Sequence, residues 1–318
     1  MPAAVLTEEL RRAFGSTRAV DGVDLAVRSG EIYGFLGPNG AGKSTVVRML
    51  CTLLLPTAGT ARVAGHDVVA DPQRVRLAIG VALQEAALDP RQSGRELLRL
   101  QGRLYGLSRS DIDRRLGELG RLIELGDALD RRVATYSGGM KRRLDLAAAL
   151  VHNPTVLFLD EPTTGLDPAS RAKVWEEVRR LNVELGMTIF LTTQYLEEAD
   201  ELAHRVGIID AGRVVAEGSP DELKRSIGHD VVVAVVESDA AAAVDALRGT
   251  RGVEHVEHHG NEVAIRTEDG SALLSPVAVT LSEHRVGVRS LTLRTPTLDD
   301  VFLQLTGGHL REREGIDG

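Results

Sequence analysis

The sequence contains a single cysteine, Cys51, and no apolar run near the ~20 residues that a membrane-spanning helix requires. One cysteine cannot form an intramolecular disulfide, so the chain needs no oxidising compartment. The N-terminus lacks the basic-then-apolar pattern of a secretory signal peptide. We therefore expect a cytosolic protein whose contact with a membrane, if it has one, goes through a partner.

Basic residues are not in excess either, because the net charge is −8 at pH 7. A general binder of nucleic acid needs many lysine and arginine side chains to pair with phosphates, so we expect no nucleic-acid partner. What remains is ordinary for a globular protein, with 43% hydrophobic and 26% charged residues. At 318 residues the chain exceeds the ~250–300 residues at which single cores stop growing, which predicts two domains.

The first part of the chain has the pattern of an α/β domain. A buried strand at 32–36 leads into a glycine-rich turn and then an apolar, helical stretch at 46–55. Helical spacing dominates about 90–152, which we expect to form a helical subdomain. Further strands at 155–159, 188–192 and 206–209 alternate with helices and indicate a largely parallel sheet. We expect this domain to span 1–225.

A second, smaller domain is predicted at 226–308, with a flexible polar tail at 309–318. Its strand–helix–strand–strand–helix–strand order is typical of a ferredoxin-like α+β fold. The expected elements are strand 231–236, helix 240–247, strands 253–256 and 262–266, helix 272–284 and strand 286–293. A final helix follows Thr297, which can cap it together with Asp300.

The glycine-rich turn fits the pattern G-x-x-x-x-G-K-[ST] of a phosphate-binding loop, and it stands where such a loop must, between a strand and a helix. Its backbone N–H groups and the helix N-terminus would point at phosphates. Lys43 would reach the β- and γ-phosphates, and the Ser44 hydroxyl would hold Mg²⁺. The residues of this predicted site are Gly37, Pro38, Asn39, Gly40, Ala41, Gly42, Lys43, Ser44 and Thr45.

An apolar strand at 155–159 ends in two carboxylates, Asp160 and Glu161. The end of a buried parallel strand emerges at the same sheet edge as the phosphate loop. Asp160 therefore suits a contact with Mg²⁺, and Glu161 suits the general base that activates the attacking water. Without the phosphate loop upstream, the same segment would be as well explained by a solvated acidic turn.

The segment Tyr136-Ser137-Gly138-Gly139-Met140-Lys141 stands just before this acidic strand, and with it the sequence resembles the ABC ATPases. Ser137 and the two glycines open a helix whose N-terminus suits an anion. The resemblance implies a P-loop fold that binds and hydrolyses ATP with Mg²⁺. It also implies a homodimer, in which Ser137, Gly138 and Gly139 act on the nucleotide held by the opposite protomer.

Three further positions take their expected roles from this resemblance. Gln84 matches the glutamine that senses Mg²⁺ and water and faces the transport partner. Asp167, in Gly165-Leu166-Asp167, matches a loop that crosses the dimer interface. Phe14 stands where the family places an aromatic ring against adenine, although an isolated phenylalanine more often belongs to a core.

Gln194 departs from the pattern of most of the family, which carries a switch histidine at this position. Glutamine can donate a hydrogen bond but cannot become cationic, so hydrolysis would rely more on Glu161. The substitution is familiar in ATPases that resemble the daunorubicin-resistance group, and this likeness extends through the closing segment 297–307. It implies the ATPase subunit of a drug or lipid exporter, attached peripherally to the cytoplasmic face of the membrane through a separate polytopic subunit.

Two alternatives stay open. A soluble ABC ATPase acting on ribosomes or chromosomes would usually have paired cassettes or a long coiled-coil insertion, and the sequence shows neither. A nucleotide-gated binding protein with negligible turnover would explain the missing histidine but not the presence of Glu161. The smaller domain could regulate the ATPase or brace its dimer.

Overall fold

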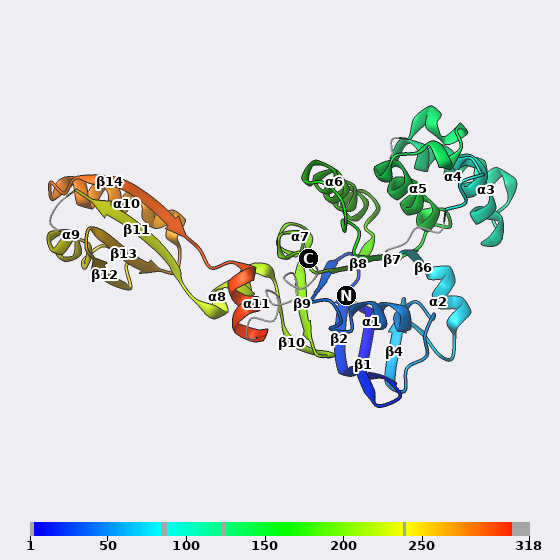
Figure 1. Cartoon of the computed structure of the whole chain (residues 1–318), viewed down its shortest axis with the longest axis horizontal. Coiled ribbons are helices and arrows are strands. Elements are labelled where there is room, and N and C mark those ends of the chain that lie inside the picture. Colours follow the sequence, from blue (N-terminus) through cyan, green and yellow to red (C-terminus); the bar gives the residue numbers. More distant parts are fainter. Residues whose placement is uncertain (1–2, 84–87, 123–124, 238–239, 307–318) are drawn as a thin grey trace, which may run out of the picture. The chain divides into compact units, whose positions relative to one another are not determined.

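The computed structural model describes residues 3–83, 88–122, 125–237 and 240–306 (Figure 1). The chain forms two compact units that divide between Pro220 and Asp221, a few residues before the boundary at 225 expected from the sequence. The expected tail at 309–318 lies outside the described residues. Of the helices that these residues form, none combines the length and the apolar character needed to cross a bilayer.

The first unit is built on a mostly parallel sheet with the strand order β10-β9-β3-β8-β7-β6. Strands β9, β3, β8, β7 and β6 run parallel, and β10 joins the edge in the antiparallel sense. Every residue of β3 and of β7 is buried, as expected for parallel strands that are covered on both faces. The strands are β3 (Ile32–Leu36), β6 (Ile79–Ala82), β7 (Val156–Asp160), β8 (Thr188–Thr193), β9 (Arg205–Asp210) and β10 (Arg213–Gly218).

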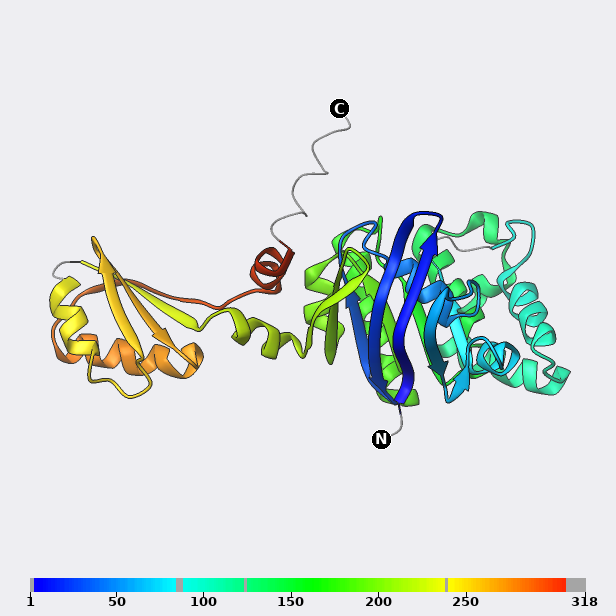
Figure 2. The same cartoon turned by 90° about the horizontal axis from the view of Figure 1, so that it is seen from below.

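An antiparallel sheet, with the order β2-β1-β4-β5, forms a second layer of this unit. Figure 2 shows β1 and β2 as a long hairpin at the start of the chain. Most of this hairpin was not evident from the sequence, because Glu8, Glu9, Arg11 and Arg12 interrupt the apolar alternation of β1 and bulges shift its register. The strands are β1 (Ala3–Phe14), β2 (Thr17–Arg28), β4 (Ala58–Val63) and β5 (His66–Asp67).

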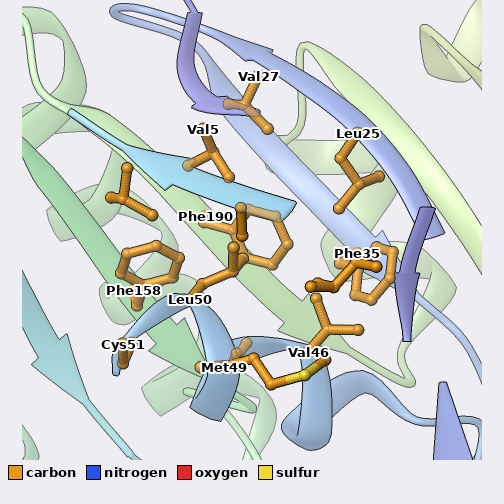
Figure 3. Close-up of a cluster of buried hydrophobic side chains, with 14 of the residues drawn as sticks. Val5, Leu25, Val27, Phe35, Val46, Met49, Leu50, Cys51, Phe158 and Phe190 are labelled. Atoms are coloured by element: carbon orange, nitrogen blue, oxygen red, sulfur yellow. The ribbon is translucent and has the colours of Figure 1, made fainter. Parts of the chain in front are cut away.

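Helix α1 (Lys43–Leu50) shares a hydrophobic core with both sheets. Figure 3 shows this cluster, to which Met49 and Leu50 of α1, Val5 and Val27 of the hairpin, and Phe190 of the parallel sheet all belong. The expectation of a helix through 55 was wrong. The chain leaves the helix after Leu50 because Thr52 has a φ of +62°, which helical residues do not adopt.

The opposite face of the parallel sheet is covered by helices α5 (Gly138–Leu150), α6 (Pro168–Leu185) and α7 (Leu196–Leu202). Strand β7 shows why one strand serves both layers, because side chains alternate between the two faces. Phe158 belongs to the core shared with α1, whereas Leu157 and Leu159 belong to the core shared with α5 and α6.

The segment between β6 and β7 is helical, as the sequence predicts, and has its own core built around Leu98, Leu116 and Leu144. Ser93 and Glu96 cap its first helix reciprocally: Ser93 Oγ accepts from Glu96 N at 3.2 Å, and Glu96 Oε2 accepts from Ser93 N at 2.8 Å. Before α5 this segment contains α3 (Gly94–Leu104), α4 (Arg109–Leu122) and two short 3₁₀ helices, Gly126–Asp130 and Val133–Thr135. Helix α2 (Pro72–Ala78) comes earlier, directly before β6.

The second unit contains an antiparallel sheet with the order β12-β13-β11-β14, packed on α9 and α10. This order and the βαββαβ sequence of elements are those of a ferredoxin-like fold. Its β12 lies a little later in the chain than the strand expected at 253–256. The elements from 220 onward are α8 (Pro220–Ile227), β11 (Asp230–Val236), α9 (Ala240–Leu247), β12 (His255–His259), β13 (Glu262–Thr267), α10 (Gly270–Glu283), β14 (Val288–Arg294) and α11 (Leu298–Thr306).

Phe190 provides a test of the first unit's core. Its ring centroid lies 5.5 Å from the ring centroids of Tyr33, Phe35 and Phe158. We expect Phe190→Ala to lower the free energy of unfolding by about 3–5 kcal/mol, because it opens a cavity among these rings. Urea unfolding followed by the fluorescence of the single tryptophan, which lies in this unit on α6, measures the change.

The matched control is Val183→Ala on α6, because Val183 is 80% exposed and its truncation opens no cavity. We expect this change to stay within about 0.5 kcal/mol of the parent. Equal stabilities of the two variants would contradict the packing described for Phe190.

Candidate functional site

The loop between β3 and α1 is wrapped so tightly that two of its positions admit only glycine. A Cβ at Gly37 would lie 2.3 Å from the carbonyl oxygen of Ile209. A Cβ at Gly42 would lie 2.4 Å from the carbonyl oxygen of Ala19, and Gly42 has a φ of +107°. Gly42 precedes the first residue of α1, where helical N–H groups lack partners within the helix. The loop therefore presents donors suited to an anion.

The contact with Ala19 brings the β1–β2 hairpin beside this loop. Phe14 lies at the end of β1 and is 47% exposed, and the guanidinium carbon of Arg12 lies 4.5 Å from the centre of its ring. An exposed aromatic ring is not part of a core, so the core reading of Phe14 does not hold. Its role toward adenine stays a prediction.

Lys43 places its ammonium group between the loop and the acidic end of β7. Its Nζ donates to the carbonyl oxygens of Gly37 at 2.7 Å and of Pro38 at 3.1 Å. The same atom lies 3.5 Å from Glu161 Oε1. Burial lowers the pKa of Lys43, while the neighbouring carboxylate of Glu161 acts in the opposite direction. The site thus holds a positive and a negative group close together in a largely buried position.

Asp160 is buried, and its Oδ1 accepts hydrogen bonds from two hydroxyl groups. Ser44 Oγ donates at 3.3 Å and Thr192 Oγ1 at 2.5 Å. Ser44 belongs to α1 and Asp160 to β7, so the loop and the acidic strand converge as the sequence predicts. A hydroxyl and a carboxylate oxygen this close suit a small, hard divalent cation such as Mg²⁺.

Glu161 follows β7 in a strained backbone conformation. Its φ is +48°, in the left-handed region that non-glycine residues rarely occupy. The surroundings hold it there, since its N–H donates to Thr192 O at 3.1 Å and to Thr192 Oγ1 at 3.0 Å. Strain of this kind is concentrated at functional sites. In this conformation Glu161 Oε1 lies 3.5 Å from Lys43 Nζ.

Gln194 follows β8 and is half-buried. Thr193 lies opposite Leu36 in the parallel pairing of β8 with β3, so Gln194 leaves the sheet at the same edge as the glycine-rich loop. Its side chain forms no hydrogen bond to any of the described residues. The structure therefore places Gln194 at the sheet edge that carries the glycine-rich loop, and its role toward the nucleotide stays a prediction.

The other residues singled out by the sequence are not joined to this group. Ser137 caps α5 by accepting from Met140 N at 3.3 Å, and Asp167 caps α6 by accepting from Ser170 N at 3.0 Å. Within the described part of the chain, neither forms a hydrogen bond to the glycine-rich loop. Gln84 lies outside the described residues.

Several buried polar residues near the site were missed by the sequence analysis. Glu198 is fully buried on α7, where it accepts from Thr163 Oγ1 at 2.8 Å and from Trp175 Nε1 at 3.1 Å. Arg142 donates to the carbonyl oxygen of Leu83 at 2.9 Å and pairs with Asp145 at 3.4 Å. The pairing of Arg142 with Asp145 three residues later on α5 was an available signal, whereas nothing in the local sequence distinguishes Glu198 from the neighbouring Glu197.

Burial has the largest effect on the ionisation of these groups. It raises the pKa of Glu198, and it raises the pKa of Asp145 to about 6 even though Arg142 opposes the shift. A buried charged group is costly unless it is paired or hydrogen-bonded, as Arg142 is with Asp145.

Comparison with known proteins identifies the group to which this geometry belongs. Residues 20–164 match the family model described as ABC transporter, and residues 218–306 match that of the ATP-binding protein DrrA1-3-like, C-terminal domain. The chain is 48% identical over 312 residues to the daunorubicin resistance ATP-binding protein DrrA3 of Streptomyces coeruleorubidus, with 98% of each covered. The chain belongs to the ABC transporter ATP-binding family.

Two further comparisons describe this ABC ATPase. It is 49% identical over 307 residues to the daunorubicin/doxorubicin resistance ATP-binding protein DrrA of Streptomyces peucetius, covering 96% of this chain and 92% of that one. Among solved structures, the dimeric post-hydrolysis state of the ATP-binding cassette MJ0796 bound to ADP and Pi matches with a TM-score of 0.61 and 25% identity. That match covers 68% of this chain and 98% of the other. The expected fold and the assignment as an ABC-type ATPase are confirmed.

Thr192 provides a test of the site, because its hydroxyl is the common partner of Asp160 and of the Glu161 N–H. We expect Thr192→Val to lower kcat for ATP hydrolysis by at least about tenfold, because it leaves a buried carboxylate without one hydrogen bond. A phosphate-release assay at saturating ATP measures the change. Thr192→Ser, which keeps the hydroxyl, is the control and should retain most of the turnover. Equal rates for the Val and Ser variants would contradict this role of the hydroxyl.

Proposed function

We propose that this ABC ATPase is the ATP-hydrolysing subunit of an exporter, and that it drives efflux of drug- or lipid-like compounds through a separate membrane subunit. The observation that carries the proposal is the convergence of Lys43, Ser44, Asp160 and Glu161 at one sheet edge. The chain's similarity to drug-resistance ATP-binding proteins over almost its whole length supports the link to efflux.

The chemistry follows from the distances within this group. Lys43 would bind the β- and γ-phosphates of ATP in place of the loop carbonyls it now contacts, with Ser44 and Asp160 as ligands of Mg²⁺. Bound Mg²⁺ would neutralise phosphate charge. Glu161 would accept the proton of the attacking water, and its carboxylate lies 3.5 Å from Lys43 of the phosphate loop. Gln194 would donate a hydrogen bond from its neutral amide to the γ-phosphate or to the water.

Composite sites in a homodimer would explain the position of the segment 136–141, which we call the signature segment. Ser137 and Gly138 are exposed, and a Cβ at Gly138 or Gly139 would meet no other atom within 4 Å. Glycines that nothing inside the chain requires leave room for a ligand to approach the N-terminus of α5. We propose that the ligand is the γ-phosphate bound by the partner protomer, with Asp167 near the interface. The dimeric state of the related cassette MJ0796 supports this arrangement.

Membership of the ABC transporter ATP-binding family supports a membrane partner and a location at the membrane. We propose that a polytopic subunit holds the ATPase at the cytoplasmic face of the membrane and that Gln84 faces this subunit. We propose that the first unit is the ATPase domain and that the second is an accessory domain that regulates the ATPase or braces the dimer. The alternative of a soluble ABC ATPase acting on ribosomes or chromosomes gains no support from the relatives, which are named for drug resistance.

Glu161→Gln tests catalysis and dimerisation together. We expect turnover to fall by at least about a hundredfold because the general base is lost, while ATP binding is retained. The variant should then elute from gel filtration as a dimer when ATP is present and as a monomer when ATP is absent. Adding Ser137→Arg should abolish the dimer, because a bulky cation would fill the signature surface. Ser110→Arg, on exposed α4, is the matched control and should leave the dimer intact.

A parent protein without measurable turnover would favour a nucleotide-gated binding protein instead. An ATP-dependent dimer that survives Ser137→Arg would contradict the composite site.

The transport role is tested by affinity purification of the tagged protein from detergent-solubilised membranes of its native host. We expect a polytopic membrane protein to co-purify in near-equal amount, as identified by mass spectrometry. Reproducible recovery of ribosomal or chromosomal proteins alone would overturn the exporter proposal in favour of the soluble alternative.

A further inference from the structure

Arg171 connects two loops that the proposed mechanism uses separately. It lies in the first turn of α6, and its Nε donates to the carbonyl oxygen of Leu166 at 3.2 Å. Its guanidinium carbon also lies 4.3 Å from the centre of the Tyr195 ring. Leu166 belongs to the segment 165–167, which is expected to reach the partner protomer, and Tyr195 directly follows Gln194. One side chain therefore joins the interface loop to the loop that carries Gln194.

Further hydrogen bonds link the elements beneath this contact. Tyr195 N donates to Thr193 Oγ1 at 2.9 Å, which fixes the start of α7 against the end of β8. Glu198 of α7 accepts hydrogen bonds from Thr163, just before the interface loop, and from Trp175 of α6. These buried hydrogen bonds hold α6 and α7 together at Glu198. The Arg171–Tyr195 contact joins α6 to the residue before α7, next to Gln194.

Because Gln194 is neutral, the Arg171–Tyr195 contact beside it can matter for how its amide is oriented. Its side chain has no hydrogen bond to the described residues, so the position of the backbone at residues 194 and 195 matters for where the amide lies. A ring held by a guanidinium restrains that backbone. Contacts made only in the right geometry contribute to rate through orientation.

We propose that Arg171 is a positioning residue for ATP hydrolysis: it holds Tyr195, and through it Gln194, in register with the interface loop 165–167. The inference rests on the proposed function, since it concerns the same site. It assigns to this chain a coupling, within one protomer, between the dimer interface and the side chain that replaces the histidine.

Arginine suits this role because its planar guanidinium can stack on a ring and donate in its own plane at the same time. Lysine has a point charge on a flexible stem and cannot do both. Phenylalanine at 195 would keep the aromatic face, whereas leucine would remove it.

The experiment measures kcat and ATP affinity separately in the full-length protein. We expect Arg171→Ala to lower kcat roughly fivefold to thirtyfold, the range of a part-buried cation–π contact, with the Kd for a fluorescent ATP analogue within about twofold of the parent. Arg171→Lys should fall by a similar factor. Lys173→Ala, which removes an exposed positive charge from the same helix, is the matched control and should match the parent.

Variants of Tyr195 test the same contact without depending on whether the Arg171 variants fold. Tyr195→Leu should lower kcat as Arg171→Ala does, and the conservative Tyr195→Phe should restore most of the turnover. The double variant Arg171→Ala/Tyr195→Leu should be no slower than the slower single variant, because both remove one contact.

Several outcomes would overturn the inference. These are a parent-like kcat for Arg171→Ala, a full multiplication of the two single effects, or a loss of ATP binding in step with kcat, which would indicate a merely structural role. If the parent hydrolyses ATP and Arg171→Ala does so equally well, only this inference fails. If the parent itself has no turnover, the proposed function fails and the inference with it.

Discussion

The parallel pairing of β8 with its two neighbours is the constraint on which the site depends. Leu36 lies opposite Thr193, and Asp160 lies opposite Thr192. The residues that follow β3, β7 and β8 therefore leave the sheet at one edge, as in other open α/β sheets. A slip of one residue would turn every side chain of a strand to the other face. It would remove Asp160 from its two hydroxyl partners and expose apolar core residues, so the same register supports both stability and chemistry.

Features of the fold and the site could be predicted from the sequence when the residues that form them lie close together along the chain. The glycine-rich loop was predictable because its chemistry lies within nine consecutive residues, and the strand ending in Asp160 because its apolar run is unbroken. The Thr192 hydroxyl was not, since its bond to Asp160 spans 32 residues and depends on register. The early end of α1 at Leu50 and the charged hairpin strand β1 depend on tertiary packing, which overrides local pattern.

The site gathers charge and strain that the fold must offset elsewhere. Lys43 and Asp160 are both buried, and Glu161 stands in a left-handed conformation that costs roughly 1–3 kcal/mol. The aromatic cluster around Phe190 lies in the same parallel sheet. The apolar packing of the sheet offsets the cost of holding Lys43, Asp160 and Glu161 in a fixed arrangement at the sheet edge. A fixed arrangement of charges is what an active site needs.

In the proposed mechanism, Gln194 changes what its neighbouring residues must supply. A histidine near neutral pH can gain a proton and hold a phosphate by charge, even when its position is imperfect. A glutamine has no charge to titrate, so its contribution depends on the direction of one amide hydrogen bond and adds no pH dependence of its own. Hydrogen bonds weaken steeply as they lose alignment. In the proposed mechanism, the alignment of the Gln194 amide takes the place of charge, and the contact of Arg171 with Tyr195 is what we propose maintains that alignment.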